Sequence, residues 1–185
     1  IAAKYVPSFE LGGDFYDFFE LNGHLGVTVG DVVGKGIAAA LLMSAVRASL
    51  RAHVQGTYDI DEVVSKVNQA LCQDMRDNEF ASLWYGVFDP SRMRLTYCSA
   101  GHEPPLVVRM PKGRAPTMAD LDELGVGGMV VGIDPSQRYQ RAIFDLRPRD
   151  VLIAYTDGLV DATNFSGQRW GKKRMREAVL ACFAN

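Results

Sequence analysis

Three aspartates in this 185-residue chain stand beside glycines, at positions where carboxylates could bind a metal ion. Asp14 follows a Gly-Gly pair, Asp31 follows a glycine, and Asp157 precedes one directly after the strand-like run 151–156. Glycines allow the backbone to approach a ligand closely. Oxygen-only ligands suit Mg²⁺ or Mn²⁺ better than zinc or copper. The alternative is that these acids are solvated residues at strand ends and turns, and for Asp157 taken alone a turn is the simpler interpretation.

A hairpin is expected to bring two of these acids together. Asn22-Gly23 predicts a two-residue turn between strands over 15–21 and 24–30, with Leu21 opposite His24. The same register places Asp14 opposite Asp31, with their Cβ atoms roughly 4.5–5.5 Å apart. Two facing carboxylates repel each other and are costly to desolvate, so they need a shared proton or a cation. The face they share is predicted to be buried because it also carries Leu25, Val27 and Val29.

The apolar pattern predicts an α+β fold in which helices are layered on a mainly antiparallel sheet. Helices are expected over 37–54, 59–77 and 172–183. Further strands are expected over 80–89, 93–99, 106–109, 130–133, 141–146 and 151–155. The first half of the first helix is apolar almost all round, so we expect it to be buried on more than one side. Strands and helices do not alternate regularly, which argues against a doubly wound parallel sheet.

Composition excludes several classes of protein. The chain has 20 basic and 22 acidic residues and a formal net charge of −2, so it is not a broadly basic nucleic-acid binder. No apolar run approaches the roughly 18 residues of a membrane span, so we expect no membrane contact. Three widely spaced cysteines suit reduced thiols in the cytoplasm. The chain opens on Ile1 without an initiator Met, which favours a piece excised from a longer protein.

Other polar residues have simpler interpretations. The segment Gly30–Gly36 lacks the spacing of a phosphate-binding P-loop. His102, after Ser-Ala-Gly, is expected to order a loop through a hydrogen bond rather than to act in catalysis. Arg47 and Arg51 share a helix face and are expected to be solvated. Asp17 falls on the opposite strand face from Asp14, so we rank it lower as a ligand.

Taken together, four motifs resemble the metal-dependent PPM-type (type 2C) serine/threonine phosphatases, in particular the bacterial branch typified by SpoIIE and RsbU. The resemblance spans almost the whole chain and implies an α-β-β-α sandwich of two mainly antiparallel sheets flanked by helices, with two Mn²⁺ or Mg²⁺ ions in an acidic cleft. The motifs are Gly-Gly-Asp14-Phe-Tyr-Asp17, Val-Gly-Asp31-Val-Val-Gly-Lys-Gly, Ser99-Ala-Gly-His-Glu-Pro-Pro-Leu and Tyr-Thr-Asp157-Gly158.

Carried over by position, the resemblance implies that Asp31 bridges the two ions and that the Val32 carbonyl is a backbone ligand. It implies that Asp14 binds one ion, directly or through water, and Asp157 the other. A water activated by the ions would attack phosphorus in line. The implied substrate is phosphoserine or phosphothreonine on an anti-sigma-factor antagonist or a similar protein.

The branch also implies a setting for the domain. The first two helices resemble a regulatory pair that couples upstream sensor or receiver domains to the metal site, and a homodimer is compatible with that arrangement. The location is cytoplasmic, although the parent protein could be anchored in a membrane.

Three departures from the family pattern leave alternatives open. Val33 stands where eukaryotic members have a histidine, and no arginine near Lys4 matches their phosphate-holding residue. The family's final Asp-Asp-x-Thr strand does not occur before Asn185, so we expect a domain over 1–185 that is truncated before its last ligand. The alternatives are a pseudophosphatase that binds a partner without catalysis, and a hydrolase of small phosphoesters.

Overall fold

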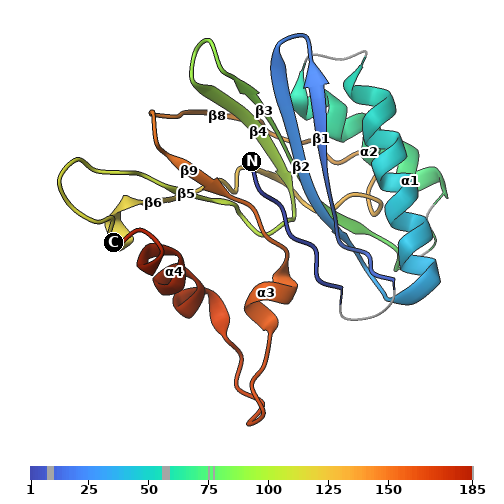
Figure 1. Cartoon of the computed structure of the whole chain (residues 1–185). Helices are drawn as coiled ribbons and strands as arrows, with labels where there is room; N and C mark the ends of the chain where they lie inside the picture. The colour runs from blue at the N-terminus through green and yellow to red at the C-terminus, as the bar shows by residue number, and fades with distance from the viewer. Residues whose placement is uncertain (8–10, 56–58, 75, 77, 185) are drawn as a thin grey trace. The chain divides into compact units, whose positions relative to one another are not determined.

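The structure is a computed structural model, and it describes residues 1–7, 11–55, 59–74, 76 and 78–184. The chain divides into two compact units (Figure 1). The first comprises Ile1–His102 and Val126–Asp145, and the second comprises Glu103–Gly125 and Leu146–Asn185.

The first unit is built on a mainly antiparallel sheet. Strands β1 to β4 pair in chain order, and β4 also pairs in parallel with β7 and antiparallel with β8. The β1–β2 register runs from Leu21 opposite His24 to Phe15 opposite Gly30, which confirms the predicted hairpin. The strands are β1 (Phe15–Leu21), β2 (His24–Val32), β3 (Ala81–Asp89), β4 (Arg94–Ala100), β7 (Gly127–Gly128) and β8 (Ala142–Asp145).

Helices α1 (Gly36–Val54) and α2 (Ile60–Asp74) pack on this sheet (Figure 1). The predicted end of the second helix, at 77, lies outside the described residues. The expectation that the first half of α1 is buried on more than one side is wrong, because Ile37 and Leu41 are 70% and 67% exposed. The described helix buries one face only, through Ala39, Val46, Leu50 and Val54.

The helices cover the face of the hairpin opposite to the one that carries Asp31. Phe15 and Phe19 of β1 and Val32 of β2 join the core formed with α1 and α2. On the face that carries Asp31, Val29 is buried but Tyr16 is 40% exposed. The apolar residues of β2 pointed to the Asp31 face, but Leu25 and Val27 on that face are only partly buried.

The second unit has its own antiparallel sheet in the order β6-β5-β9, and helices α3 and α4. Leu106, Tyr155, Val160 and Met175 form its core. Arg109, which follows β5, binds Asp122 of β6 at 2.8 Å and Asp150, which precedes β9, at 2.6 Å. The elements are β5 (Leu106–Val108), η1 (Met118–Asp120), β6 (Leu121–Glu123), β9 (Val151–Ile153), α3 (Asp157–Asp161) and α4 (Gly171–Ala181).

The strand predicted over 130–133 is wrong. Val131 exchanges two backbone hydrogen bonds with Ala81, at 2.9 and 3.0 Å, but this is an isolated bridge. The pairing with β4 is made instead by β7, where a Cβ on Gly127 would lie 1.7 Å from the Ser99 carbonyl oxygen. Only glycine allows so close an approach of two backbones. The α+β class, with two mainly antiparallel sheets and helices in each unit, is confirmed.

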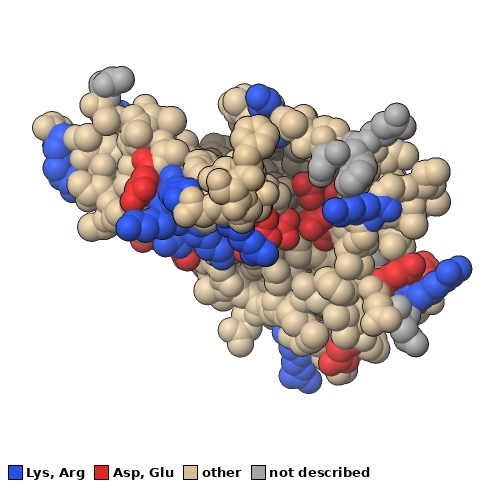
Figure 2. Space-filling model, turned by 90° about the horizontal axis from the view of Figure 1, so that it is seen from below, with Lys and Arg blue, Asp and Glu red and all other residues tan. Residues whose placement is uncertain are grey.

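The surface charges, helix α1 and the cysteines can be compared with what composition indicated about nucleic-acid binding, membrane spans and disulfides. Figure 2 shows acidic side chains beside basic ones on the face that it draws, in keeping with ion pairs such as Lys172–Glu103 and Arg176–Glu123. Among the described residues, only α1 meets a length and composition test for a membrane span, which a core helix of a soluble protein also passes. The three cysteines are free thiols.

Candidate metal centre

Asp14 and Asp31 stand together at one end of the hairpin. The last β1–β2 pair is Phe15 opposite Gly30; Asp14 is the residue just before β1, and Asp31 follows Gly30 within β2. Both side chains belong to partly buried residues. The turn that sets this register has positive φ at both central residues, 48° for Asn22 and 84° for Gly23, as a type I′ turn requires. Local turn geometry therefore delivers the two acids to one place.

A tyrosine that the sequence did not point to lies near both acids. Burial raises the pKa of the Tyr5 phenol, and the negative charges of Asp14 and Asp31 raise it further. The Tyr5 hydroxyl lies close to the chain just before Asp14, since a Cβ built on Gly12 would be 2.9 Å from it. No local pattern marks Tyr5, because it precedes the hairpin and reaches it only in the folded chain.

The backbone at the acids is unusually close-packed. A Cβ built on Gly13 would lie 2.4 Å from the Val32 carbonyl oxygen and 3.2 Å from the Val32 carbonyl carbon and nitrogen. The Gly13 backbone therefore lies directly against the Val32 carbonyl, which the resemblance assigns as a ligand. Gly13 is therefore required for steric reasons, because any side chain there would clash with the Val32 backbone.

Substituting Gly13→Ala should strain the close contact between the Gly13 and Val32 backbones. The clash is with backbone atoms, which no rotamer change relieves, so we expect a loss of about 1–3 kcal/mol in the free energy of unfolding. Urea unfolding in EDTA measures this loss without any contribution from bound ions. The matched control is Gly12→Ala, whose Cβ would meet only the Tyr5 hydroxyl, at 2.9 Å, at the end of a movable side chain. Equal stability of the two variants would contradict a steric clash at position 13.

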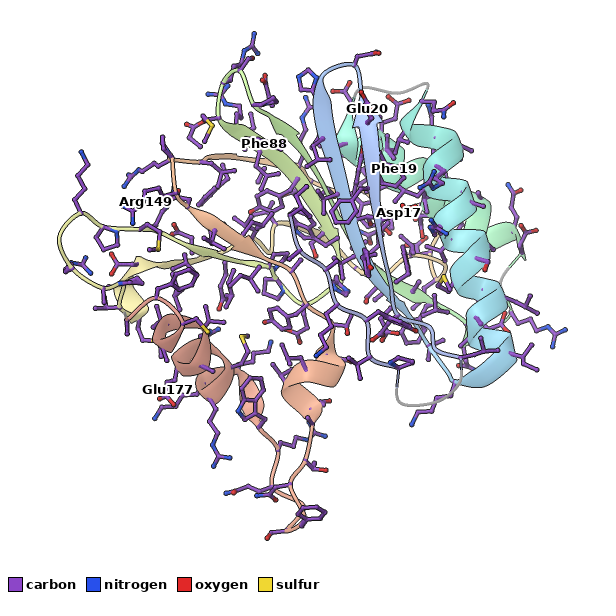
Figure 3. All side chains as sticks on the ribbon, viewed as in Figure 1. Asp17, Phe19, Glu20, Phe88, Arg149 and Glu177 are labelled. Atoms are coloured by element: carbon purple, nitrogen blue, oxygen red, sulfur yellow. The ribbon has the colours of Figure 1, made fainter. Side chains whose placement is uncertain are left out.

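Asp17 is not near this site but binds helix α1. Its carboxylate accepts hydrogen bonds from Arg47 Nε at 2.7 Å, Arg51 Nε at 2.7 Å and Arg51 Nη2 at 2.6 Å. Figure 3 shows Asp17 and Phe19 on β1 beside α1, and the Arg51 guanidinium lies 5.3 Å from the centre of the Phe19 ring. The low rank given to Asp17 as a ligand agrees with this placement. The expectation that both arginines are simply solvated is wrong.

This cluster changes the acidity of Asp17. Burial alone would raise the pKa of the carboxyl, but hydrogen bonds from Arg51 and Arg47 and from the Phe18 amide outweigh it and lower the pKa to about 2. The carboxylate is thus charged and fully engaged with α1. It joins the strand that begins just after Asp14 to the first helix.

Asp157 lies in the second unit, as the first residue of α3, and is exposed. The apolar run before it forms β9 and the buried Tyr155, as the sequence indicated. Whether Asp157 joins Asp14 and Asp31 stays a prediction, because it belongs to a different unit. Within the described ranges, no group of three or more His, Cys, Asp or Glu side chains is arranged to hold a metal ion.

His102 is 94% buried, and its Nδ1 lies 2.7 Å from the Ser82 hydroxyl. The expected ordering hydrogen bond is therefore present. Its partner was not foreseen, because it stands 20 positions earlier in the chain, on β3.

The first unit offers a partial set of ligands that fits a hard divalent cation. Two carboxylates at one ladder end and the Val32 carbonyl held against Gly13 supply oxygen donors only. Such donors suit Mg²⁺ and Mn²⁺, and a divalent cation would offset the repulsion between facing acids.

Comparison with known proteins defines the class. The SiaA-PP2C domain of Pseudomonas aeruginosa superposes with a TM-score of 0.77 at 22% identity, over 94% of this chain and 68% of that one. The fold is therefore that of a PP2C-type phosphatase domain. The family model described as Stage II sporulation protein E (SpoIIE) matches residues 22–185, and the chain belongs to this family.

Two curated relatives match over most or all of the chain. Protein IcfG of Synechocystis sp. is 29% identical over 100% of this chain and 32% of its own length. Phosphoserine phosphatase RsbU of Bacillus subtilis is 27% identical over 90% of this chain and 48% of its own length. The chain thus spans about a third to a half of the relatives that it matches.

Proposed function

We propose that this chain hydrolyses phosphoserine or phosphothreonine on a regulatory protein, with two Mn²⁺ or Mg²⁺ ions as cofactors. The observation that carries the proposal is the placement of Asp14 and Asp31 just beyond the last β1–β2 pair, with the Val32 carbonyl close to Gly13. Membership of the SpoIIE family and the likeness to a relative named as a phosphoserine phosphatase support the reaction class.

The proposed roles follow from the donor atoms. Asp31 would serve as the ligand common to both ions, the Val32 carbonyl and Asp14 would complete the ligands from the first unit, and Asp157 would hold the second ion. When bound, the ions would supply an activated water for in-line attack on phosphorus and would offset charge on the phosphoryl oxygens. The absence of a side chain at Gly13 leaves room beside the Val32 carbonyl oxygen. That a further strand after Asn185 supplies a last ligand stays a prediction.

The proposed substrate is a phosphorylated anti-sigma-factor antagonist or a similar protein, in the cytoplasm. The likeness to RsbU, a phosphoserine phosphatase, supports the phosphoserine part of this choice. Helices α1 and α2 are proposed to receive the signal from an upstream sensor or receiver domain. The binding of Asp17 on β1 by two arginines of α1 supports such coupling, since it links α1 to the strand next to Asp14.

The test is Mn²⁺-dependent release of phosphate from a phosphoserine protein by the whole gene product. We expect turnover with Mn²⁺ or Mg²⁺, its loss on treatment with EDTA, and its return when the ion is restored. A sugar phosphate serves as the comparison substrate and should turn over far more slowly. Faster turnover of the sugar phosphate would favour a small-phosphoester hydrolase. Calorimetry that detects no Mn²⁺ binding would favour a pseudophosphatase.

A further inference from the structure

His102 occupies its buried place because of the glycine before it. Gly101 has φ of +66°, and a Cβ there would lie 2.5 Å from Val130 Cγ1 and 2.9 Å from the Val130 nitrogen. Gly101 also bridges to Leu83 of β3 and donates its amide to the Gly128 carbonyl at 2.9 Å. These contacts set the chain beside β3 just after β4 ends. The imidazole of the next residue is thereby directed onto that strand.

The residue that the imidazole meets is the cross-strand partner of Asp31. Ser82 is directly opposite Asp31 in the antiparallel β2–β3 ladder, so their side chains project from the same face, with Cβ atoms roughly 4.5–5.5 Å apart. The Ser82 hydroxyl also lies 3.5 Å from the Asp31 carbonyl oxygen, which is long for a hydrogen bond. Ser82 therefore stands between the buried ring and the proposed bridging acid.

One tautomer of His102 gives the hydrogen bonds of His102 and Ser82 a defined direction. A serine hydroxyl has one proton and two acceptor sites. If His102 Nδ1–H donates to Ser82 Oγ at 2.7 Å, the serine proton stays directed toward Asp31. Without the ring, the hydroxyl can rotate among its staggered positions. The His102 backbone is held in turn by the Ser99 hydroxyl, which lies 3.4 Å from its carbonyl oxygen.

We propose that Ser82 and His102 form a positioning pair that fixes Asp31 for metal binding. The ring acts through the serine and is not itself a ligand. This inference rests on the proposed metal-dependent function, and it assigns a role to a buried histidine and a strand serine that the proposed ligand set leaves unused. Groups that orient metal ligands typically contribute 10–100-fold to metal affinity.

Two amide substitutions test which of the two ring nitrogens of His102 is needed. His102→Asn keeps a hydrogen-bonding nitrogen near the position of Nδ1, whereas His102→Gln moves it toward Nε2. We expect Mn²⁺ affinity, measured by calorimetry on the whole gene product, to fall roughly 10–100-fold in Ser82→Ala and His102→Gln. His102→Asn should retain most of the affinity. The double variant Ser82→Ala/His102→Gln should bind no more weakly than the worse single variant, because the two residues act as one unit.

The matched control removes a buried hydroxyl from the same sheet. Thr28 Oγ1 donates to the Trp84 carbonyl at 2.9 Å, on the face of β2 away from Asp31. Thr28→Val should lower the melting temperature in EDTA while leaving Mn²⁺ affinity unchanged. Unchanged affinity in Ser82→Ala, or an equal loss in Thr28→Val, would overturn the proposal.

A measurement without metal separates this proposal from the function itself. In EDTA, Ser82→Ala and His102→Gln should shift the Asp31 amide resonance alike, and His102→Asn should leave it close to that of the wild type. If the Asp31 amide does not respond, the positioning role is refuted whether or not the protein binds Mn²⁺. If the amide responds but the wild type binds no Mn²⁺, the proposed function fails, and with it the assignment of Asp31 positioning to metal binding.

Discussion

Replacing Asp31 by Asn should abolish phosphate release while leaving the fold intact. The change removes the charge of the proposed bridging ligand and keeps its shape, so we expect turnover of a phosphoserine protein to fall on the order of 10³-fold or more. Mn²⁺ affinity measured by calorimetry should fall with it. Activity that survives the substitution would mean that the assigned roles are wrong.

The same variant should behave differently without metal. Two neighbouring carboxylates repel each other, and Asp31→Asn removes one of the two charges. In EDTA we therefore expect the free energy of unfolding to rise by about 0.2–1 kcal/mol. The control is Asp145→Asn, an exposed carboxylate on β8 that pairs with Arg94 at 2.9 Å and should leave Mn²⁺ affinity unchanged. A marked loss of stability in Asp31→Asn would instead indicate that Asp31 has a structural role.

Replacing Asp17 by Asn should weaken the attachment of α1 to β1. The Asp17 side chain is 7% exposed, while Arg47 and Arg51 are about half exposed, at 46% and 50%. Lowering the pKa of the carboxyl from 3.8 to about 2 corresponds to a contribution of about 2 kcal/mol to the free energy of unfolding at neutral pH. Urea unfolding of the wild type and the variant should show this difference.

The pH dependence of that difference has a definite sign. The folded-state pKa is lowered, so the contribution is fully present above the ordinary value of 3.8 and is lost as the pH falls toward about 2. The wild type and Asp17→Asn should therefore converge in stability over that interval. The matched control for the loss of a carboxylate is Glu20→Gln, on an exposed residue of the same strand (Figure 3). A difference that does not change with pH would contradict the ion-pair explanation.

If Asp17 couples α1 to the metal site, its loss should reach beyond stability. We expect Asp17→Asn to weaken any dependence of activity on upstream domains, measured as the ratio of turnover with and without the activating signal. Arg51→Lys should be more damaging than Arg47→Lys, because Arg51 makes two hydrogen bonds to Asp17 and lies over Phe19. A lysine cannot reproduce that planar fork.

The features that depend on residues adjacent in the chain could be predicted from the sequence. The Asn22-Gly23 turn determined the register of β1 and β2, because only residues tolerant of positive φ fit a type I′ turn and the turn then fixes each pair. That was enough to bring Asp14 and Asp31 to one ladder end. Family motifs in their order supplied the class of phosphatase, which the family match then confirmed.

The side of the sheet that faces the helices was decided only in the folded chain. Phe15, Phe19 and Asp17 share one face and Tyr16 and Phe18 the other, so the strand pattern alone is ambiguous. Pairing of Asp17 with Arg47 and Arg51, some 30 residues away, accompanies the packing of that face against α1. A buried charge needs a partner, and the partner stands on another element.

Long-range contacts completed the candidate site in the same way. Tyr5 near the two acids, Ser82 opposite Asp31, and His102 against Ser82 all join segments distant in sequence. The chain by itself determined which acids stand together, because a two-residue turn acts locally. Which groups surround and orient them was decided by the tertiary structure, because strand neighbours and buried hydrogen bonds are chosen by the packing of the whole sheet.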